Sequence, residues 1–443
     1  MKIYNYPSKS AETRVAVIAN RSLQFTKKDL YEITRIIEDV RKRGDKALIK
    51  YANRFDSPGL KVGSLKVTKN EIETAVKNVD RPFVRSLNRA AAQIKAFHKQ
   101  QLRSSWVNTD RPGTLLGQLV NPVDTVGVYA PGGKGGKIPL VSSVLMGVIP
   151  AGIAGVKHIT MVTPPRKDGT VDPHLLVASK KVGVDDVFKV GSAWAIAALA
   201  YGTETIPKAD VIVGPGNIYV TLAKKIVSGV VGIDIIAGPS EIMVIADETA
   251  IPEFVAADLL SQAEHDILSS AILVTNSKEM AKAVEDAVEE QLKTLIRKEI
   301  VKNSLTRFGA IIVVPDLVTA MELANRIAPE HIELQIKDPF EYIGQIHNAG
   351  AVFIGNYTPE PVGDYIAGPN HVLPTAGTAR FASALSVDHF IKKTSLIYYS
   401  KEALKREAND IIRLAEIEKL DAHANSIKVR LKTDKIDNLC QKN

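Results

Sequence analysis

The sequence predicts an α/β fold with two parallel-sheet domains. Short runs of β-branched residues alternate with helical segments, first between residues 126 and 213 and again after Ala237. Such alternation is typical of parallel strands joined by crossover helices. At 443 residues the chain is also too long for one ordinary hydrophobic core. We therefore expect two α/β units, either in tandem or with one interrupting the other.

The residues before Val126 carry helical rather than strand patterns. Residues 1–25 form a polar lead-in, which we expect to be an N-terminal arm. Thr26 suits the N-cap of a helix whose apolar residues recur at helical spacing until Gly44 ends it. A second helical tract covers about residues 81–102. Both are expected to be ordinary packing helices.

Eight short segments are predicted to be strands. They are VGVY at 126, ITMVT at 159, VFKV at 187 and VIV at 211 in the first unit, and IMVIA at 242, AILVT at 271, AIIVV at 310 and AVFI at 351 in the second. After Phe390 the sequence becomes charged and helical in pattern. We expect residues 386–443 to form a helical C-terminal arm that docks on another surface.

One apolar stretch has the length of a membrane span. Residues 138–156 carry no charge, but prolines, glycines and serines interrupt them, and they lie between two predicted strands. We expect a buried helix followed by a loop. The first 14 residues also lack the apolar run of a signal peptide. No membrane association is therefore predicted.

The cysteine content and the charge pattern narrow the possible partners. The chain has one cysteine, Cys440, which can form neither an internal disulfide nor a cysteine-based zinc site. Any metal must then be bound by nitrogen and oxygen, and a cytoplasmic location is expected. The net charge of +8 is spread along the chain among acidic residues. This favours a solvated basic surface over a nucleic-acid site.

Two residue pairs could carry proton transfer or metal binding. Gln262 and His265 stand three residues apart after Pro252, so they share one face of a predicted helix and could converge on one ion; a solvated helix face is the alternative. Glu330 and His331 follow Pro329, and a turn there would let both serve one site. A carboxylate beside an imidazole is a natural acid/base pair, although a helix start with a capping acid has the same pattern.

Two further segments add candidate ligands. The loop from Gly355 to Phe381 is rich in glycine and proline and carries Asp364 and His371. Long irregular loops in compact domains are usually functional. Glu418 and His423 lie in the C-terminal segment, where a solvated helix face is the alternative. An amide oxygen, two imidazoles and a carboxylate would fit a zinc ion that also accepts substrate atoms, and these are offered by Gln262, His265, Asp364 and His423.

Three glycine-containing turns follow predicted strands, where open α/β sheets bind ligands. They are Tyr129 to Gly133, Gly214 to Asn217, and Gly238 to Ser240. None of them is a GxGxxG fingerprint. Each alone is more often a simple turn than a cofactor contact.

Six motifs, in this order, resemble the histidinol dehydrogenase family. They are GPGNIYVTLAKK, GIDIIAGPSEIMVIAD, ADLLSQAEHD, APEHIEL, GPNHVLPTAGTARF and AHANSIKVR, and the resemblance covers about residues 18–430. It implies two incomplete Rossmann-like domains. We place the first at 26–128 plus 240–385, with most of the zinc and catalytic site, and the dinucleotide-binding second domain at 129–239. Residues 1–25 and 386–443 are the two arms.

The resemblance also implies the activity and its residues. It implies an NAD-dependent alcohol and aldehyde dehydrogenase that oxidises L-histidinol to L-histidine through L-histidinal with two NAD, the last steps of histidine biosynthesis. Zinc would be held by Gln262, His265 and Asp364, with His423 contributed across a homodimer. His331 would take the hydroxyl proton, and Glu330 would activate water. Substrate contacts would come from Ser240, Gln262, His265, His331, Asp364, His371, Glu418 and His423.

The cofactor half departs from the family pattern. Tyr129 and Asn217 match expected cofactor contacts, but Trp194 stands in Gly191-Ser192-Ala193-Trp194 where the family usually has Gly-Gly-Ala-Gln. The loop from Lys134 to Lys137 is longer and carries two added lysines. We hypothesise that Trp194 stacks on the cofactor and that the lysines approach its phosphates.

Two other functions fit parts of the sequence. A relative within the family could oxidise a different polar alcohol, keeping the metal and proton-handling residues. A basic α/β binding protein without catalysis would instead bind polyanions in a salt-dependent manner and hold no metal.

Overall fold

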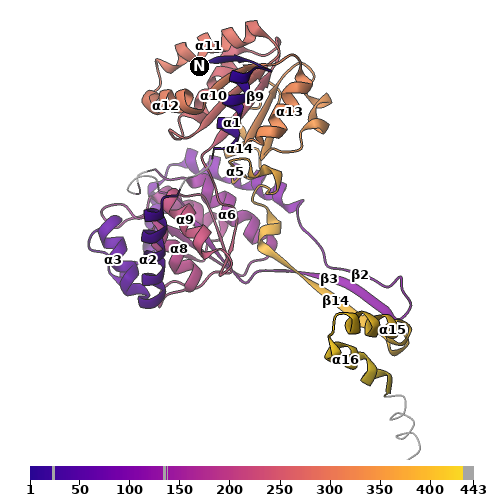
Figure 1. Ribbon diagram of the computed structural model, residues 1–443. Coiled ribbons are helices and arrows are strands. Elements are labelled where there is room, and N and C mark those ends of the chain that lie inside the picture. The colour runs from indigo at the N-terminus through magenta and orange to yellow at the C-terminus, as the bar shows by residue number, and fades with distance from the viewer. Residues whose placement is uncertain (22–24, 133–135, 137, 433–443) are drawn as a thin grey trace, which may run out of the picture. The chain divides into compact units, whose positions relative to one another are not determined.

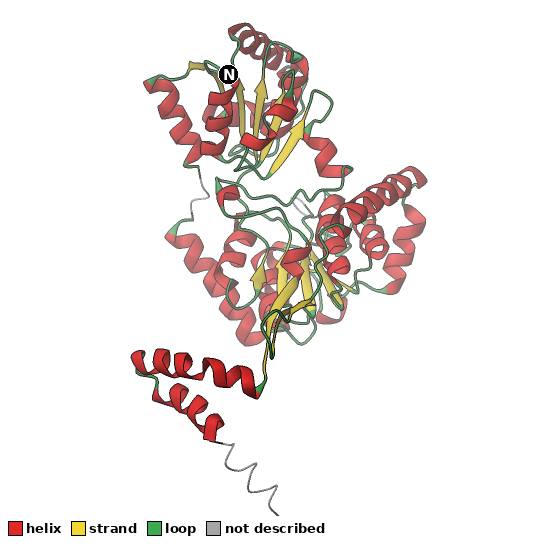
Figure 2. Ribbon diagram, turned by 90° about the vertical axis from the view of Figure 1, so that its right-hand side faces the viewer, coloured by secondary structure: helices red, strands yellow, loops and turns green. Residues whose placement is uncertain are grey.

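The computed structural model describes residues 1–21, 25–132, 136 and 138–432. The chain divides into two compact units, one formed by Met1–Leu102 with Val123–Phe390 and the other by Arg103–Pro122 with Ile391–Asn443. Each unit contains its own sheet structure, shown in Figures 1 and 2. Cys440 and the loop residues Gly133, Lys134, Gly135 and Lys137 lie outside the described residues.

The first unit contains a six-stranded parallel sheet. Its strand order is β1-β11-β10-β9-β12-β13. The strands are β1 (Ile3–Asn5), β9 (Glu241–Ala246), β10 (Ser270–Thr275), β11 (Ala310–Val313), β12 (His331–Gln335) and β13 (Ala351–Ile354). Between them run α10 (Pro252–Ala263), α11 (Lys278–Leu292), α12 (Lys298–Phe308) and α13 (Leu317–Ile327). From β9 the chain forms one side of the sheet through β10 and β11 and then returns to the other side for β12 and β13, so the sheet is doubly wound.

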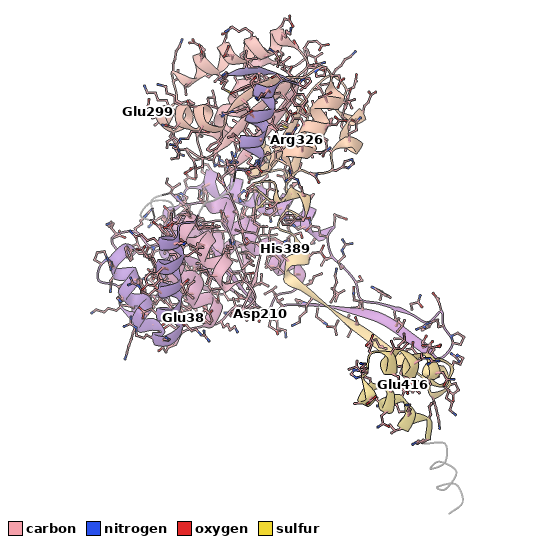
Figure 3. All side chains as sticks on the ribbon, viewed as in Figure 1. Glu38, Asp210, Glu299, Arg326, His389 and Glu416 are labelled. Carbon is pink, nitrogen blue, oxygen red and sulfur yellow. The ribbon has the colours of Figure 1, made fainter. Side chains whose placement is uncertain are left out.

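The same unit contains a five-stranded parallel sheet with the same winding. Its order is β6-β5-β4-β7-β8. The strands are β4 (Thr125–Tyr129), β5 (His158–Thr163), β6 (Asp186–Lys189), β7 (Val211–Val213) and β8 (Gly232–Ile233), and the helices are α6 (Val141–Ala154), α7 (Pro173–Val182), α8 (Ser192–Tyr201) and α9 (Ile218–Val227). Asp210, labelled in Figure 3, accepts backbone N–H bonds from Asp124 and Thr125 and ties the start of β4 to β7. The predicted α/β fold with two parallel sheets is confirmed.

The N-terminal residues pack differently from the predicted domain boundaries. The expected arm, residues 1–25, contains β1, which pairs with β11, and α1 (Lys9–Ala19), which packs on α13. Its Val15 and Ile18 are buried in that core. The first residues therefore complete the six-stranded sheet. A three-residue strand at a sheet edge carries too short a pattern to be recognised from sequence.

The helices between residues 26 and 102 also belong with the other sheet. They are α2 (Lys27–Arg43), α3 (Asp45–Phe55), α4 (Lys69–Asn78) and α5 (Arg81–Lys99). Helix α2 packs on α8 and α9, while α4 and α5 pack on α7 and α6. The sequence placed residues 26–128 with residues 240–385, whereas these helices pack on the helices of the five-stranded sheet, and β4 is one of its strands. An amphipathic pattern shows which face of a helix is buried but not which element covers it.

The apolar stretch at residues 138–156 forms the buried helix α6, as expected. Its Gly147 faces β4 so closely that an added Cβ would lie 2.8 Å from Cγ1 of Val128. The helix therefore rests directly on the sheet. Within the described part of the chain, no helix is both long and apolar enough to cross a membrane.

The second unit joins a small antiparallel sheet to a helical hairpin. The strand order is β14 (Ile391–Tyr399), β3 (Thr114–Pro122) and β2 (Trp106–Asn108), and the helices are α15 (Lys401–Ile417) and α16 (Asp421–Lys432). Arg111 joins the β2–β3 segment to α15 through Glu407 at 3.0 Å. The prediction of a purely helical segment at 386–443 was wrong for β14. This exposed strand is stabilised by pairing with β3, nearly 300 residues earlier in the chain, and such pairing leaves no local signal.

Candidate active site

Glu330 and His331 are held together by one residue of the neighbouring strand. His331 opens β12, Glu330 precedes it in a bend, and Glu241 opens β9. The N–H of Glu241 donates to Oε2 of Glu330 at 2.9 Å, and the N–H of Glu330 donates to Oε2 of Glu241 at 3.1 Å. The carbonyl of Glu241 lies 2.9 Å from Nδ1 of His331. The turn after Pro329 thus brings the two predicted catalytic residues together, at the amino ends of the parallel strands.

The contact with the Glu241 carbonyl fixes which nitrogen of the His331 ring carries the proton. A carbonyl can only accept, so Nδ1 must carry the proton and Nε2 must present its lone pair. Within the described residues Nε2 is buried without a hydrogen-bond partner. Burial lowers the pKa of His331 to about 4. The imidazole is therefore neutral at physiological pH, with a free acceptor nitrogen suited to remove a proton.

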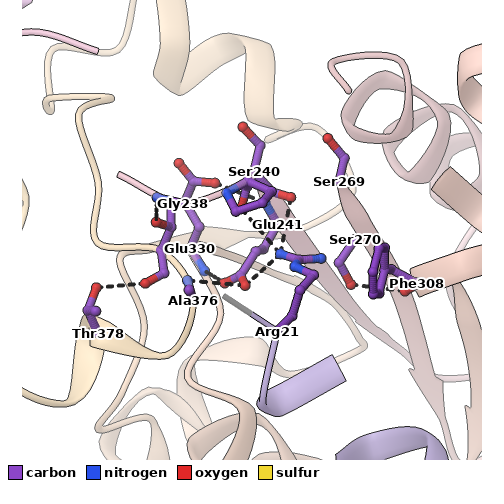
Figure 4. A network of polar contacts seen from close by, with 12 residues as sticks. Arg21, Gly238, Ser240, Glu241, Ser269, Ser270, Phe308, Glu330, Ala376 and Thr378 are labelled. Atoms are coloured by element: carbon purple, nitrogen blue, oxygen red, sulfur yellow. Dashed lines mark hydrogen bonds and ion pairs between the residues drawn. The ribbon is translucent and has the colours of Figure 1, made fainter. Parts of the chain in front are cut away.

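An ion pair locks Glu241 in turn (Figure 4). Nη2 of Arg21 donates to Oε1 of Glu241 at 2.7 Å and to the carbonyl of Pro239 at 3.2 Å. Both side chains are almost fully buried. The N–H of Ala376 adds a bond to the same Glu241 oxygen at 3.2 Å. Arg21 and Glu241 were not predicted from sequence, although an acid directly before the apolar run of β9 was a usable signal.

A second group of polar side chains lies beside His331. Helix α14 (Glu360–Tyr365) supplies Glu360 and Asp364, and a ligand atom of each lies within 4.8 Å of the other and of one on His331. With its amide oriented to satisfy both neighbours, Gln262 donates to the Glu360 carboxylate at 2.9 and 3.1 Å and accepts from the N–H of Glu241. Burial, reinforced by Asp364, raises the pKa of Glu360 to about 8. Glu360 is a further site residue that the sequence reasoning missed.

The remaining predicted residues of the first unit lie around this group. His371 is mostly buried, and its Nδ1 lies 3.1 Å from the carbonyl of Asp364 and 3.9 Å from Oδ1 of the same residue. Ser240 directly precedes Glu241 and appears beside it in Figure 4. His265 follows α10 and is exposed. The predicted residues Gln262, Asp364 and His371 are thus brought near the acid/base pair.

Two predicted ligands belong to the second unit. Glu418 is the C-cap of α15, and His423 lies in the first turn of α16. Both side chains are exposed. The sequence spacing does bring them into one helical hairpin, on adjoining ends of its two helices.

The donor set suits a zinc ion. It contains imidazole nitrogen, carboxylate oxygen and amide oxygen without sulfur, and the carboxylates of Glu360 and Asp364 lie close together beside the His331 imidazole. Crowded buried carboxylates and imidazoles are also what a divalent cation would stabilise. The residues present therefore fit the metal that the sequence predicts.

A cavity of about 930 Å³ opens at the carboxyl ends of the five-stranded sheet. Tyr129 ends β4, and Asn217 caps α9 after β7; both line the cavity. Between these strands the chain order reverses, which is where doubly wound sheets bind dinucleotides. Gly214 has a φ of +115°, and an added Cβ would lie 2.2 Å from the Tyr129 carbonyl. Only glycine allows the turn after β7 to pass this close to β4.

Trp194 lines the same cavity but is only 5% exposed. Its ring lies against Phe55 at 5.4 Å and Tyr51 at 6.0 Å between centroids. Its Nε1–H donates to Oδ2 of Asp56 at 3.1 Å. Little ring surface is left for a ligand, which disfavours the hypothesis that Trp194 stacks on the cofactor. The hypothesis about Lys134 and Lys137 falls outside the described residues.

Asp56 gives a pH-dependent prediction for stability. Burial raises the pKa of its carboxyl from 3.8 to about 6. Between these pH values the folded protein keeps a proton on Asp56 that the unfolded chain loses, so the free energy of unfolding falls as pH rises. The whole of this loss is present above about pH 6. We expect Asp56→Asn to raise the free energy of unfolding by up to about 3 kcal/mol at pH 8, and by roughly 0.5 kcal/mol near pH 4. Urea unfolding at both pH values tests this; an equal effect at both would contradict it.

The comparisons with known proteins agree with this architecture. The family model described as histidinol dehydrogenase matches residues 19–431. A histidinol dehydrogenase of Desulfotalea psychrophila is 55% identical over 397 residues, covering 90% of this chain and 92% of its own. That of Clostridium acetobutylicum is 53% identical, with 90% and 91% covered. The crystal structure of histidinol dehydrogenase from Elizabethkingia anophelis has a TM-score of 0.91 at 39% identity, covering 98% of this chain and 99% of that one.

A match across nearly the whole chain, with about half of the residues identical, accounts for the fold and for the ordered motifs together. The chain therefore belongs to the histidinol dehydrogenase family of oxidoreductases.

Proposed function

We propose that this protein oxidises L-histidinol to L-histidine through L-histidinal, with a bound zinc ion and two NAD as hydride acceptors, in the last steps of histidine biosynthesis. The observation that carries the proposal is the buried, unpartnered Nε2 of His331 beside the carboxylates of Glu360 and Asp364. Family membership supports the substrate. The cavity at Tyr129, Trp194 and Asn217 is the proposed NAD site.

The first oxidation needs a base for the hydroxyl proton. Nε2 of His331 accepts it, because Nδ1 is already committed to the carbonyl of Glu241. The resulting imidazolium keeps that bond and is stabilised by the negative charge of Asp364. NAD, when bound, would accept hydride from the same carbon.

The second oxidation needs water to add to the aldehyde. Burial holds the pKa of Glu330 well above its usual value, which makes its carboxylate a stronger base towards that water than an exposed glutamate would be. The backbone bond from Glu241 keeps the carboxyl oriented. A second NAD, when bound, would accept hydride from the hydrated aldehyde and leave the acid.

The metal site is proposed to consist of Gln262, His265 and Asp364, with His423 of the partner subunit in a homodimer. Zinc, when bound, would act mainly as a template that fixes the alcohol carbon. Ser240, His371 and Glu418 are proposed to hold the substrate with the ligand residues. A cytoplasmic location remains a prediction.

The proposed function is tested by substrate choice and metal dependence. Purified protein with NAD should oxidise L-histidinol and leave other amino alcohols, such as leucinol, unused. Chelation should abolish the activity, and added zinc should restore it. Efficient oxidation of another alcohol, with histidinol left unoxidised, would instead indicate that this protein is a relative within the family with a different substrate.

Glu360 is expected to control zinc affinity through Gln262. Glu360→Leu removes the acceptor that orients the Gln262 amide, so zinc affinity should fall about 10- to 100-fold. Competitive titration with a chromogenic chelator measures this without relying on activity. Asp316→Asn is the control, since Asp316 caps α13 at the protein surface. Unchanged zinc affinity in Glu360→Leu would contradict this role.

A further inference from the structure

Asp56 is a carboxylate built into the wall of the proposed cofactor cavity. It follows α3, and Oδ2 accepts from the N–H of Gly191 at 3.3 Å and from Nε1 of Trp194 at 3.1 Å. Gly191 comes just after β6. Asp56 is therefore fixed over the carboxyl edge of the five-stranded sheet, with its charge at the cavity.

The carboxylate has no cationic partner. In residues 1–21, 25–132, 136 and 138–432, no lysine or arginine pairs with Asp56, and both of its hydrogen bonds end on Oδ2. A charge held only by neutral donors in a buried place costs stability. Proteins retain such local conflicts where the group has a use. The free oxygen, Oδ1, is the one available to a ligand in the cavity.

The charge of the described cavity lining favours ribose hydroxyl groups over an added 2′-phosphate. The described lining includes Glu32, Asp56 and Asp266 but neither lysine nor arginine. A carboxylate accepts hydrogen bonds from both ribose hydroxyls of NAD, whereas the 2′-phosphate of NADP would be repelled and needs a basic partner.

The position matches the adenosine half of a dinucleotide. Gly191 follows β6, and Gly214 follows β7, with β5 and β4 between those strands. This separation is roughly 14 Å at the usual strand spacing. In doubly wound sheets the adenosine lies over the first three strands and the nicotinamide over the other side. His265, a proposed zinc ligand, lines the same cavity, so the nicotinamide is expected towards that residue.

We propose that Asp56 selects NAD over NADP by accepting hydrogen bonds from the adenosine ribose, and that Trp194 is the positioning residue that aims it. The inference rests on the proposed NAD dependence. The indole lies against Tyr51 and Phe55, so its Nε1–H has a fixed direction. An amide in place of Trp194 could donate the same bond but lacks this aromatic support.

Calorimetric titration with NADH and with NADPH tests the inference without turnover. The wild type should bind NADH more tightly. Asp56→Asn should lower the ratio of NADH to NADPH affinity roughly tenfold or more, the range for losing a charged hydrogen bond. Trp194→Phe keeps the ring but not the donor, and should lower the same ratio by a smaller factor. Glu38→Gln removes a charge from α2 outside the cavity and should leave the ratio unchanged.

The outcomes separate the inference from the proposed function. If the wild type prefers NADH and Asp56→Asn keeps the full preference, Asp56 is not the selecting residue and the NAD dependence stands. If the wild type prefers NADPH, the inference is overturned. If the protein binds neither dinucleotide, both the inference about Asp56 and the proposed NAD dependence are overturned. Asp56→Ser repeats the test should the asparagine variant not fold.

Discussion

Replacing His331 with asparagine is expected to lower kcat for histidinol oxidation by roughly a hundredfold to ten-thousandfold. The asparagine amide can still donate to the carbonyl of Glu241, so the local fold should persist. What is lost is the buried Nε2, the only acceptor of His331 not committed to the protein in the described residues. Steady-state NADH formation and thermal unfolding of the same preparation measure the two effects separately.

His98 offers a matched control for this substitution. It is fully buried, its Nδ1 lies 2.8 Å from Oε1 of Gln101, and its Nε2 is also unpartnered among the described residues. It lies in α5, and its hydrogen-bond partner, Gln101, is not a residue of the site. His98→Asn should reduce stability but keep kcat of the folded protein within about twofold, the variation expected of a residue outside the chemistry. If both variants lose activity equally, His331 acts through packing and not as the base.

Replacing Arg21 with methionine is expected to destabilise the protein by about 3–5 kcal/mol, because it leaves the buried Glu241 carboxylate without its cation. Burial already raises the pKa of Glu241, and only Arg21 pairs with it in the described structure. Because Glu241 orients both Glu330 and His331, kcat should fall as well. Urea unfolding measures the first effect and NADH formation the second.

Two further variants test the origin of that loss. Arg21→Met combined with Glu241→Gln removes the buried charge, so the pair should recover a large part of the stability lost by Arg21→Met alone. Arg326→Met breaks an exposed ion pair with Glu12 of similar length, 2.6 Å, and should cost less than about 1 kcal/mol. A similar cost for Arg21→Met and Arg326→Met would show that burial of the pair is not decisive.

The fold class could be predicted because both sheets are parallel and buried. Their strands are short, nearly continuous apolar runs, as in the fully buried β9, and such runs are recognisable in the sequence. The domain boundaries could not be predicted in the same way. Helix α2 has a clear apolar face, but only the structure shows that α8 and α9 cover it. Strands β1 and β14 depend on partners hundreds of residues away.

The site was predictable where chemistry is concentrated in adjacent residues. Glu330 with His331, and Gln262 near His265, stand out as polar pairs at the end of apolar segments. The supporting residues do not. Arg21 and Glu241 are 220 positions apart, and their pairing follows from the packing of α1 beside the six-stranded sheet. Trp194 was recognised as unusual, but its contact with Asp56 requires α3 to lie against α8.

The most direct test of the four-electron oxidation is the stoichiometry of the complete reaction. Zinc-loaded protein is given a limiting amount of L-histidinol with excess NAD, and the NADH formed is counted against the histidine produced. Two NADH per histidinol, with histidine as the product and no released aldehyde, is the predicted result. One NADH per histidinol with accumulated aldehyde, or no NADH at all, would contradict the proposal that Glu330 and His331 carry both oxidation steps.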